Sequence, residues 1–353
     1  MGRVGVVEED QASKVNERYS RQILFREIGA AGQERLMNSR VLLVGCGALG
    51  AAHAEMLARA GVGRLRIVDR DFVEYTNLQR QTLYSEADAN ERAPKAVAAK
   101  DRIARINSEI DVEAVVADVN QSNIESLIDG CDLVIDGTDN FQVRYLLNDA
   151  CVKHGKIWIY GAAVSSYGTT MTIIPGETPC LRCIFDEMPD AGSSPTCDTA
   201  GVIMPIIATV SATQVSEALK ILVGDTASLH RSLMQFDVWA NDRQRIKLGP
   251  PNSDCRTCGE RIFDFLDSET PEFSAVLCGR NAVQIAPPSA TTLDLEQLAD
   301  RLQFITGVDQ NEYLLRFASG EHEVTVFRDG RAIVKGTDDV TVARSIYAKY
   351  IGV

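Results

Sequence analysis

A glycine-rich loop, VGCGALG, spans Val44 to Gly50 and follows an apolar run that begins at Val41. A Gly-x-Gly-x-x-Gly loop between a strand and a helix turns tightly and lets the backbone approach a phosphate, while the helix N-terminus offers N–H donors. The run LRIVD then ends at Asp69, where an acidic side chain of such a fold bonds a ribose hydroxyl. NAD and ATP share this adenosine, so the loop alone leaves both open. The candidate residues are Gly45, Gly47, Gly50 and Asp69.

A polar segment beginning three residues after Asp69 places amide and basic side chains beside this loop. It contains NLQRQ and then Lys95, which opens a helix behind Pro94. Cationic side chains near a helix N-terminus suit a triphosphate whose pyrophosphate leaves. A solvated charged surface loop is the alternative, but the position directly after the expected ribose acid favours the nucleotide. The candidates are Asn77, Arg80, Gln81 and Lys95.

The sequence DGTDN, Asp136 to Asn140, follows another apolar run. Ligands of open α/β sheets lie at the carboxyl ends of strands, so Asp139 and Asn140 are expected to face the same crevice as the glycine loop. Asp139 is a candidate magnesium ligand, because magnesium is typically held by one or two carboxylates plus substrate phosphates. The alternatives are an aspartate in a turn and an asparagine that caps the helix beginning at Phe141.

Two Cys-x-x-Cys pairs stand far apart in the chain, at 180–183 and 255–258. Four thiolates match tetrahedral zinc and leave no open position for water or substrate. We therefore expect a structural zinc ion that ties the end of the first domain to its middle, the alternative being four thiols without metal. The ligands would be Cys180, Cys183, Cys255 and Cys258.

The elements that must position these residues alternate between strand and helix. Residues 18–40 carry helical spacing, and YGTTMTIIPG follows IWIYG after too short a turn for a crossover helix. A Rossmann-like, mixed but mainly parallel sheet with an antiparallel extension is therefore expected. The predicted strands are 41–45, 65–69, 111–119, 132–140 and 157–161, and the predicted helices are 49–60, 94–106, 141–154 and 205–223.

Residues 249–275 shift to Pro, Ser, Asp and Cys, which indicates a boundary. Beyond it we predict one strand in AVLCGRNAVQI, a helix, three meandering strands and a final helix from about Val340, together a small α+β module. The predicted organisation is a flexible N-terminal arm at 1–17, a nucleotide-binding domain with zinc at 18–265, and the small domain at 272–353.

The composition of the chain limits the classes of partner that it can bind. A formal net charge of −13 over 353 residues, with no basic run, argues against nucleic acid. The longest apolar candidate, VIMPIIATVSA from Val202, is interrupted by proline and polar residues, so no membrane span is expected. The N-terminal stretch has acidic residues where a signal peptide would be apolar, so the cytoplasm is the predicted location. In that reducing compartment the nine cysteines would not form a disulfide set.

The set RYSRQ, GCGALG, IVDRD, NLQRQ, PK, GTDN and the two Cys-x-x-Cys pairs resembles the ubiquitin-activating-enzyme-like adenylyltransferases of the ThiF/MoeB/HesA family, over roughly residues 17–260. The resemblance implies an enzyme that uses ATP and Mg²⁺ to adenylate the C-terminal glycine of a small ubiquitin-fold sulfur carrier and releases pyrophosphate. It also implies a homodimer with one structural zinc per subunit. Thiamin, molybdopterin and other sulfur pathways all remain open.

The resemblance also assigns residue roles. Arg80, Lys95 and Asp139 would be catalytic, and Arg21, the second arginine of RYSRQ, would reach the triphosphate bound by the neighbouring subunit. Some relatives place a thiol near Cys197 that bonds covalently to the activated carrier, whereas the alternative is a loop cysteine without a catalytic task. The implied nucleotide site adds Ala48 and Asp71 to Gly45, Gly47, Gly50, Asp69, Asn77, Arg80, Gln81, Lys95, Asp139 and Asn140.

Two rival functions remain. A nicotinamide-dependent oxidoreductase would need a catalytic His or Lys with an acid, for which the sequence offers no candidate. A non-catalytic scaffold that binds a ubiquitin-like partner would lack the catalytic charges, yet Arg80, Lys95 and Asp139 are all present.

Overall fold

The computed structural model describes residues 17–189, 197–268, 274–277, 281–287, 292–304 and 307–351. The chain forms two compact units. The first holds the described residues up to Met188 and from Val202 to Asp267, and the second holds those from Pro189 to Gly201 and from Ser268 onward. The N-terminal arm predicted at 1–17 lies outside these residues except for Glu17.

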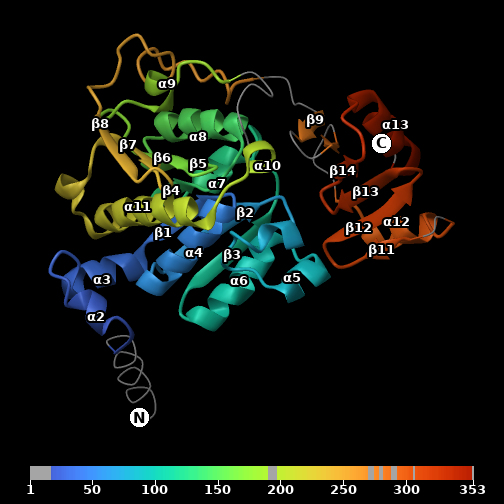
Figure 1. Cartoon of the computed structure of the whole chain (residues 1–353), viewed down its shortest axis with the longest axis horizontal. Helices are drawn as coiled ribbons and strands as arrows, with labels where there is room; N and C mark the ends of the chain where they lie inside the picture. Colours follow the sequence, from blue (N-terminus) through green and yellow to red (C-terminus); the bar gives the residue numbers. More distant parts are fainter. Residues whose placement is uncertain are drawn as a thin grey trace. The chain divides into compact units, whose positions relative to one another are not determined.

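The first unit is built on one eight-stranded sheet, in the order β3-β2-β1-β4-β5-β6-β7-β8 (Figure 1). Strands β1 to β5 run parallel, while β6, β7 and β8 extend the sheet with antiparallel pairing. This confirms the predicted mixed sheet. The strands are β1 Arg40–Val44, β2 Arg64–Asp69, β3 Asp111–Val116, β4 Leu133–Asp136, β5 Trp158–Val164, β6 Tyr167–Ile173, β7 Ser232–Asp237 and β8 Asp242–Lys247.

Helices cover both faces of this sheet because successive strand residues point to opposite sides. Leu43 and Ile67 pack on the side of α4, α6 and α11, whereas Leu42 and Val68 pack on the side of α7 and α8. The helices are α2 Ser20–Ile23, α3 Gly29–Asn38, α4 Ala48–Ala60, α5 Glu86–Glu91, α6 Lys95–Ile106, α7 Ile124–Ile128, α8 Phe141–Lys153, α9 Leu181–Ile184 and α11 Met204–Val223, with short 3-10 turns η1 Tyr75–Asn77 and η2 Thr226–Ser228.

The stretch 18–40, for which helical spacing was predicted, contains two helices, α2 and α3. Helix α2 ends at Ile23, and α3 begins at Gly29, which has a positive φ of 57°.

Helix α11 corresponds to the helix predicted at 205–223 and begins one residue earlier, at Met204. It has 20 residues and a mean hydropathy of 1.4 over an 18-residue window, enough by length and composition to cross a membrane. It packs, however, against β5, β6 and α4, and it buries the polar side chains Ser211, Gln214 and Glu217. These contacts make α11 a core helix of the first unit.

The second unit contains an antiparallel sheet in the order β11-β12-β13-β14-β10-β9, with two helices packed on one apolar core. The single strand predicted for AVLCGRNAVQI is wrong: β9 and β10 form a hairpin in which Ala282 pairs with Leu277. Asn281 has a φ of 45°, a left-handed conformation that suits a turn. The elements are α10 Cys197–Ala200, β9 Ser274–Leu277, β10 Ala282–Ile285, α12 Leu295–Arg301, β11 Asp309–Gln310, β12 Leu314–Ser319, β13 His322–Phe327, β14 Ala332–Lys335 and α13 Val340–Tyr350.

Candidate active site

The glycine loop lies where the sheet order reverses, between β1 and β4. Gly45 donates its N–H to Val68 O at 2.8 Å, and Gly137 donates to Val44 O at 2.8 Å. A Cβ on Gly45 would lie 2.8 Å from Gly137 O, and one on Gly137 would lie 2.8 Å from Gly50 Cα. Gly50 in turn lies against Gly45, whose carbonyl oxygen a Cβ there would overlap. The loops after β1 and β4 therefore pack on each other through backbone alone.

Asp69, at the end of β2, holds the glycine loop in place. Its buried carboxylate accepts from Cys46 N at 2.6 Å and from Asp71 N at 2.7 Å. Burial raises the pKa of Asp69, while Lys95 and these two backbone donors favour the charged form. Asp69, which the sequence predicts to bind a ribose hydroxyl, therefore also fixes the backbone of the glycine loop.

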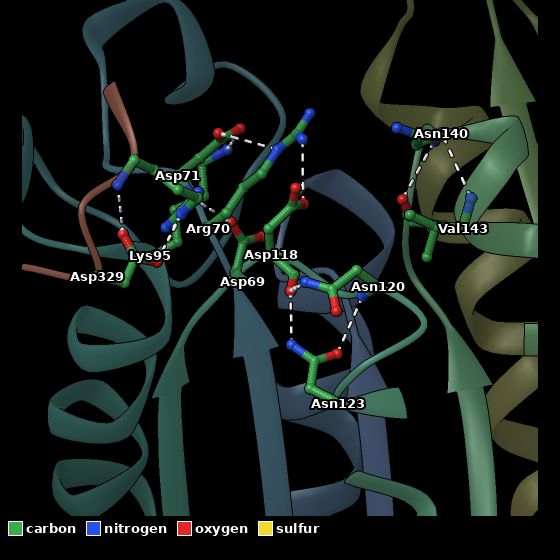
Figure 2. A network of polar contacts seen from close by, with 12 residues as sticks. Asp69, Arg70, Asp71, Lys95, Asp118, Asn120, Asn123, Asn140, Val143 and Asp329 are labelled. Atoms are coloured by element: carbon green, nitrogen blue, oxygen red, sulfur yellow. Dashed lines mark hydrogen bonds and ion pairs between the residues drawn. The ribbon is translucent and has the colours of Figure 1, made fainter. Parts of the chain in front are cut away.

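Lys95 stands at the first residue of α6 and is almost fully buried. Its Nζ lies 3.2 Å from Asp71 Oδ2, and its backbone N–H donates to Asp71 O at 2.9 Å. Figure 2 shows Lys95 directed toward Asp71 beside the end of β2. Tyr84 ties this helix start to the loop, since its hydroxyl donates to Cys46 O at 2.7 Å and lies 3.2 Å from Lys95 O. No local pattern marked Tyr84 in the sequence.

Arg70 is a second cation at the strand ends, present in the IVDRD motif but given no role by it. Its guanidinium lies 3.1 Å from Asp118 Oδ1 and 3.8 Å from Asp71 Oδ1. The Asp118 carbonyl accepts from the side-chain amides of Asn120 and Asn123 at 3.2 and 2.7 Å (Figure 2). This network fixes the chain after β3, next to the end of β2.

The NLQRQ segment folds back as the turn η1. Asn77 is buried and its Oδ1 accepts from Glu74 N at 2.9 Å, while Arg80, half-buried, donates to Thr76 O at 2.8 Å. Gln81 is buried beside the glycine loop: its Nε2 would lie 3.9 Å from a Cβ on Gly47, and its Oε1 is without a hydrogen-bond partner in the described part of the chain. Asn77 and Gln81 are therefore packed into the first unit, whereas Tyr75, Thr76 and Gln79 are exposed.

The DGTDN loop joins β4 to α8. Asn140 caps α8 by accepting from Val143 N at 3.3 Å, as Figure 2 shows, so the capping role considered for it is confirmed. Thr138 N donates to Asp136 Oδ1 at 2.9 Å, which tightens the turn before Asp139. The Asp139 side chain is exposed at the carboxyl end of β4.

Arg144, one turn into α8, fixes this loop through hydrogen bonds. No pattern in the sequence indicated this role. Arg144 is 5% exposed, and its guanidinium donates to Asp136 Oδ2 at 3.0 Å, Thr138 O at 2.6 Å and Gly161 O at 3.0 Å. Its charge offsets the burial that raises the pKa of Asp136. Arg144 fixes both the end of β4 and the loop that carries Asp139.

A second buried contact joins the helices to the same strand ends. Gln214 of α11 donates from Nε2 to Asp136 O at 3.1 Å and to Ile159 O at 3.2 Å. Its Oε1 lies 2.8 Å from His53 Nε2 on α4, so that ring nitrogen is the donor. Burial lowers the pKa of His53 to about 4, which keeps the ring neutral. The helix after the glycine loop is thereby fastened to α11 and the sheet.

The four cysteines of the two pairs come together, as the spacing predicts. Their sulfur atoms all lie within 4.8 Å of one another. The Cys180–Cys183, Cys180–Cys255 and Cys183–Cys258 sulfur distances are 3.8, 3.6 and 3.3 Å. Sulfur atoms at tetrahedral corners 2.3 Å from a zinc ion would be about 3.8 Å apart. The donor set and its spacing fit zinc.

Two other residues were predicted to act in the reaction, Arg21 and Cys197. Arg21 is exposed on α2. Cys197 is half-buried at the first residue of α10 and belongs to the second compact unit. The roles given to both stay predictions.

Comparison with known proteins shows which family the chain is similar to. A model described as "ThiF family" matches residues 19–257. The chain is 47% identical over 337 residues to the sulfur carrier protein ThiS adenylyltransferase of Bacillus subtilis strain 168, covering 95% of this chain and 99% of that protein. This alignment includes most of the second unit. The chain is also 37% identical to the sulfur carrier protein adenylyltransferase of Thermus thermophilus, over 69% of this chain and 91% of that one.

Solved structures support the fold alone. A crystal structure of Escherichia coli MccB with ATP superposes with a TM-score of 0.60 at 24% identity, covering 69% of this chain and 75% of that one. Because the family model and the Bacillus subtilis relative both cover well over half of the sequence, the chain belongs to the ThiF family.

Proposed function

We propose that this protein is an adenylyltransferase that uses ATP to activate the C-terminal glycine of a ubiquitin-like sulfur carrier and releases pyrophosphate. The observation that carries the proposal is the convergence of the glycine loop, buried Lys95 and the Asp139 loop at the carboxyl ends of β1, β2 and β4. Supporting it, the chain is 47% identical over nearly its whole length to a ThiS adenylyltransferase. No specific observation favours a nicotinamide enzyme or a scaffold.

This arrangement supports a nucleotide site at the carboxyl ends of the strands. The glycine loop and the α6 N-terminus offer backbone N–H donors to the phosphates, and the Asp69 carboxylate accepts a hydrogen bond from a ribose hydroxyl. Although Asp69 already accepts from Cys46 N and Asp71 N, each carboxylate oxygen can accept a further bond. The NLQRQ turn forms one side of the site through its two buried side chains, Asn77 and Gln81. The site we propose comprises Gly45, Gly47, Ala48, Gly50, Asp69, Asp71, Asn77, Arg80, Gln81, Lys95, Asp139 and Asn140.

The reaction needs no side-chain base. The carrier's terminal carboxylate is already ionised near neutral pH and attacks the α-phosphorus, forming an oxygen–phosphorus bond as the bond to pyrophosphate breaks on the opposite side. Catalysis then rests on orientation and on positive charge around the phosphates, which Lys95 and Arg80 supply. Mg²⁺, held by Asp139 and the phosphates, would neutralise charge on the leaving pyrophosphate.

We further propose that the cysteine cluster holds a structural zinc ion. Two knuckles 75 residues apart converge on one point, and four sulfur ligands leave no position for substrate. Zinc would therefore stabilise the first unit and take no part in the transfer. Thiolate ligands require a reducing environment, which supports a cytoplasmic location.

The central experiment is ATP–pyrophosphate exchange with candidate carriers, each intact and with its terminal glycine deleted. Lys95→Ala and Arg80→Ala should lower exchange by about 100-fold or more, because each removes a charge from the phosphates. Lys100→Ala is the matched control, since Lys100 is exposed on the same helix as Lys95. Equal exchange with truncated carriers, or wild-type exchange by Lys95→Ala, would refute the proposal.

We propose that the enzyme is a homodimer in which Arg21 acts on the neighbouring subunit's nucleotide. Mixing two inactive variants, Arg21→Ala and Lys95→Ala, tests this. In a mixed dimer one site then carries both defects and the other carries none, so a 1:1 mixture should recover about a quarter of wild-type exchange. No recovery after verified subunit exchange would show that Arg21 does not act across the dimer.

We propose Cys197 as the thiol whose sulfur attacks the adenylated C-terminal glycine of the carrier, forming a thioester as the bond to AMP breaks and AMP leaves. A carrier-linked species that is sensitive to thiol reagents and disappears in Cys197→Ser would support this role. An undiminished linked species in that variant would exclude it.

A further inference from the structure

Two consecutive side chains of α8, Asn148 and Asp149, face the two cysteine pairs and are fully buried. Asn148 Oδ1 accepts from Leu181 N at 2.9 Å, directly after Cys180. Asn148 therefore fixes the backbone directly after Cys180, the first ligand of the first pair.

Asp149 makes the corresponding contacts with the second pair. Its Oδ1 accepts from Thr257 Oγ1 at 2.8 Å, and Thr257 stands between the ligands Cys255 and Cys258. Its Oδ2 accepts from Phe265 N at 2.9 Å, which fixes the chain that leaves this pair. A buried carboxylate needs such donors, and here both oxygens have one.

The order along the chain makes this arrangement informative. The two pairs are separated by 75 residues, whereas the side chains that hold them are neighbours on one helix. A helix is rigid over two adjacent residues, so α8 sets the position of one pair relative to the other. Asn148 Nδ2 is in addition buried and has no hydrogen-bond partner within the described ranges, so a donor is available beside the Cys180 pair.

We propose that Asn148 and Asp149 are positioning residues that hold the two cysteine pairs in the zinc-accepting arrangement before the metal binds. This inference rests on the proposed zinc site. Residues that orient metal ligands through hydrogen bonds typically change metal affinity by 10- to 100-fold when replaced. The four sulfur atoms are thus arranged by α8, and zinc completes the arrangement.

The test measures zinc release from the purified full-length protein to a chromogenic chelator. Asn148→Ala and Asp149→Ala should each release zinc about 10- to 100-fold faster than wild type. Asp149→Asn keeps one acceptor oxygen and should fold, with a smaller increase. Lys153→Gln is the control, since Lys153 lies on the same helix and its half-buried side chain pairs with Glu125 rather than with the cysteine pairs; it should release zinc at the wild-type rate.

A second measurement separates positioning from general destabilisation. Each variant, stripped of metal and shown to be folded by circular dichroism, is titrated with Co²⁺ while the thiolate absorption is followed. Weakened Co²⁺ binding in folded Asp149→Asn supports the inference. If the wild-type protein contains zinc but the variants release zinc and bind Co²⁺ as the wild type does, the positioning inference is overturned while the zinc proposal stands. Wild-type protein that binds neither metal would overturn the zinc proposal and this inference together.

Discussion

Replacing Arg144 by methionine should destabilise the first unit strongly. Methionine keeps most of the side-chain length but removes the guanidinium from Asp136, whose carboxylate has no solvent exposure, and from the carbonyls of Thr138 and Gly161. Breaking a buried pair by removing one partner costs about 3–5 kcal/mol, because the other charge is left uncompensated. We expect a loss in this range at pH 8.

The size of this loss should depend on pH in a defined direction. Burial already raises the pKa of Asp136, and Arg144 counteracts this effect. Without Arg144 the carboxyl group takes up a proton more readily, which removes the uncompensated charge. The destabilisation should therefore shrink as the pH is lowered from 8 toward 5.

Urea unfolding followed by tryptophan fluorescence provides the assay. The chain has two tryptophans, Trp158 and Trp239, and both belong to the first unit, so the signal reports on that unit. The double variant Asp136→Asn/Arg144→Met should be less destabilised than the two single losses added together, by about 2 kcal/mol, because the pair is coupled. Additive losses, or a loss below about 1 kcal/mol for Arg144→Met, would refute the role given to this contact.

Three further predictions follow from contacts described above. Gly50→Ala should abolish nucleotide binding, measured by calorimetry, because the new methyl group would overlap Gly45 O, whereas Gly249→Ala, with open space at its Cβ position, should bind normally. His53 has a pKa of about 4 in the fold against 6.5 unfolded, so the unfolded state takes up a proton first as the pH falls, and up to about 3 kcal/mol of stability is lost between pH 6.5 and 4. His53→Gln should flatten that part of the stability–pH profile; an unchanged slope would contradict the neutral buried ring. Removing metal with a chelator should lower the melting temperature of the first unit by about 4 °C or more, restored by added zinc, and an unchanged melting temperature would argue against a structural metal.

The sequence predicted those features that depend on local pattern. Apolar runs followed by Gly-rich or polar turns located β1, β2 and β4, and two short cysteine spacings located a cluster that depends on residues 75 positions apart. Asn140 was correctly weighed as a helix cap because capping is decided by the adjacent residues.

The remaining features depend on contacts that no local pattern encodes. Tyr84, Arg144 and Asn148 look like ordinary helix or turn residues in the sequence, and their partners become visible only when the strands are assembled. The β9–β10 hairpin was missed because an apolar run with a short polar interruption reads as one strand, whereas Asn281 adopts a left-handed conformation there.

The mutual contact of Gly45, Gly50 and Gly137 has a consequence for how nucleotide preference can change in this fold. In the proposed nucleotide site the floor is main chain from two loops that pack directly on each other, so none of these three glycines can gain a side chain without displacing the facing loop. Selection or engineering that alters the bound nucleotide should therefore act on side chains around this floor, at positions such as Asn77 and Gln81, rather than on Asp69, which holds the glycine loop. Those side chains can be altered one residue at a time while the floor is kept.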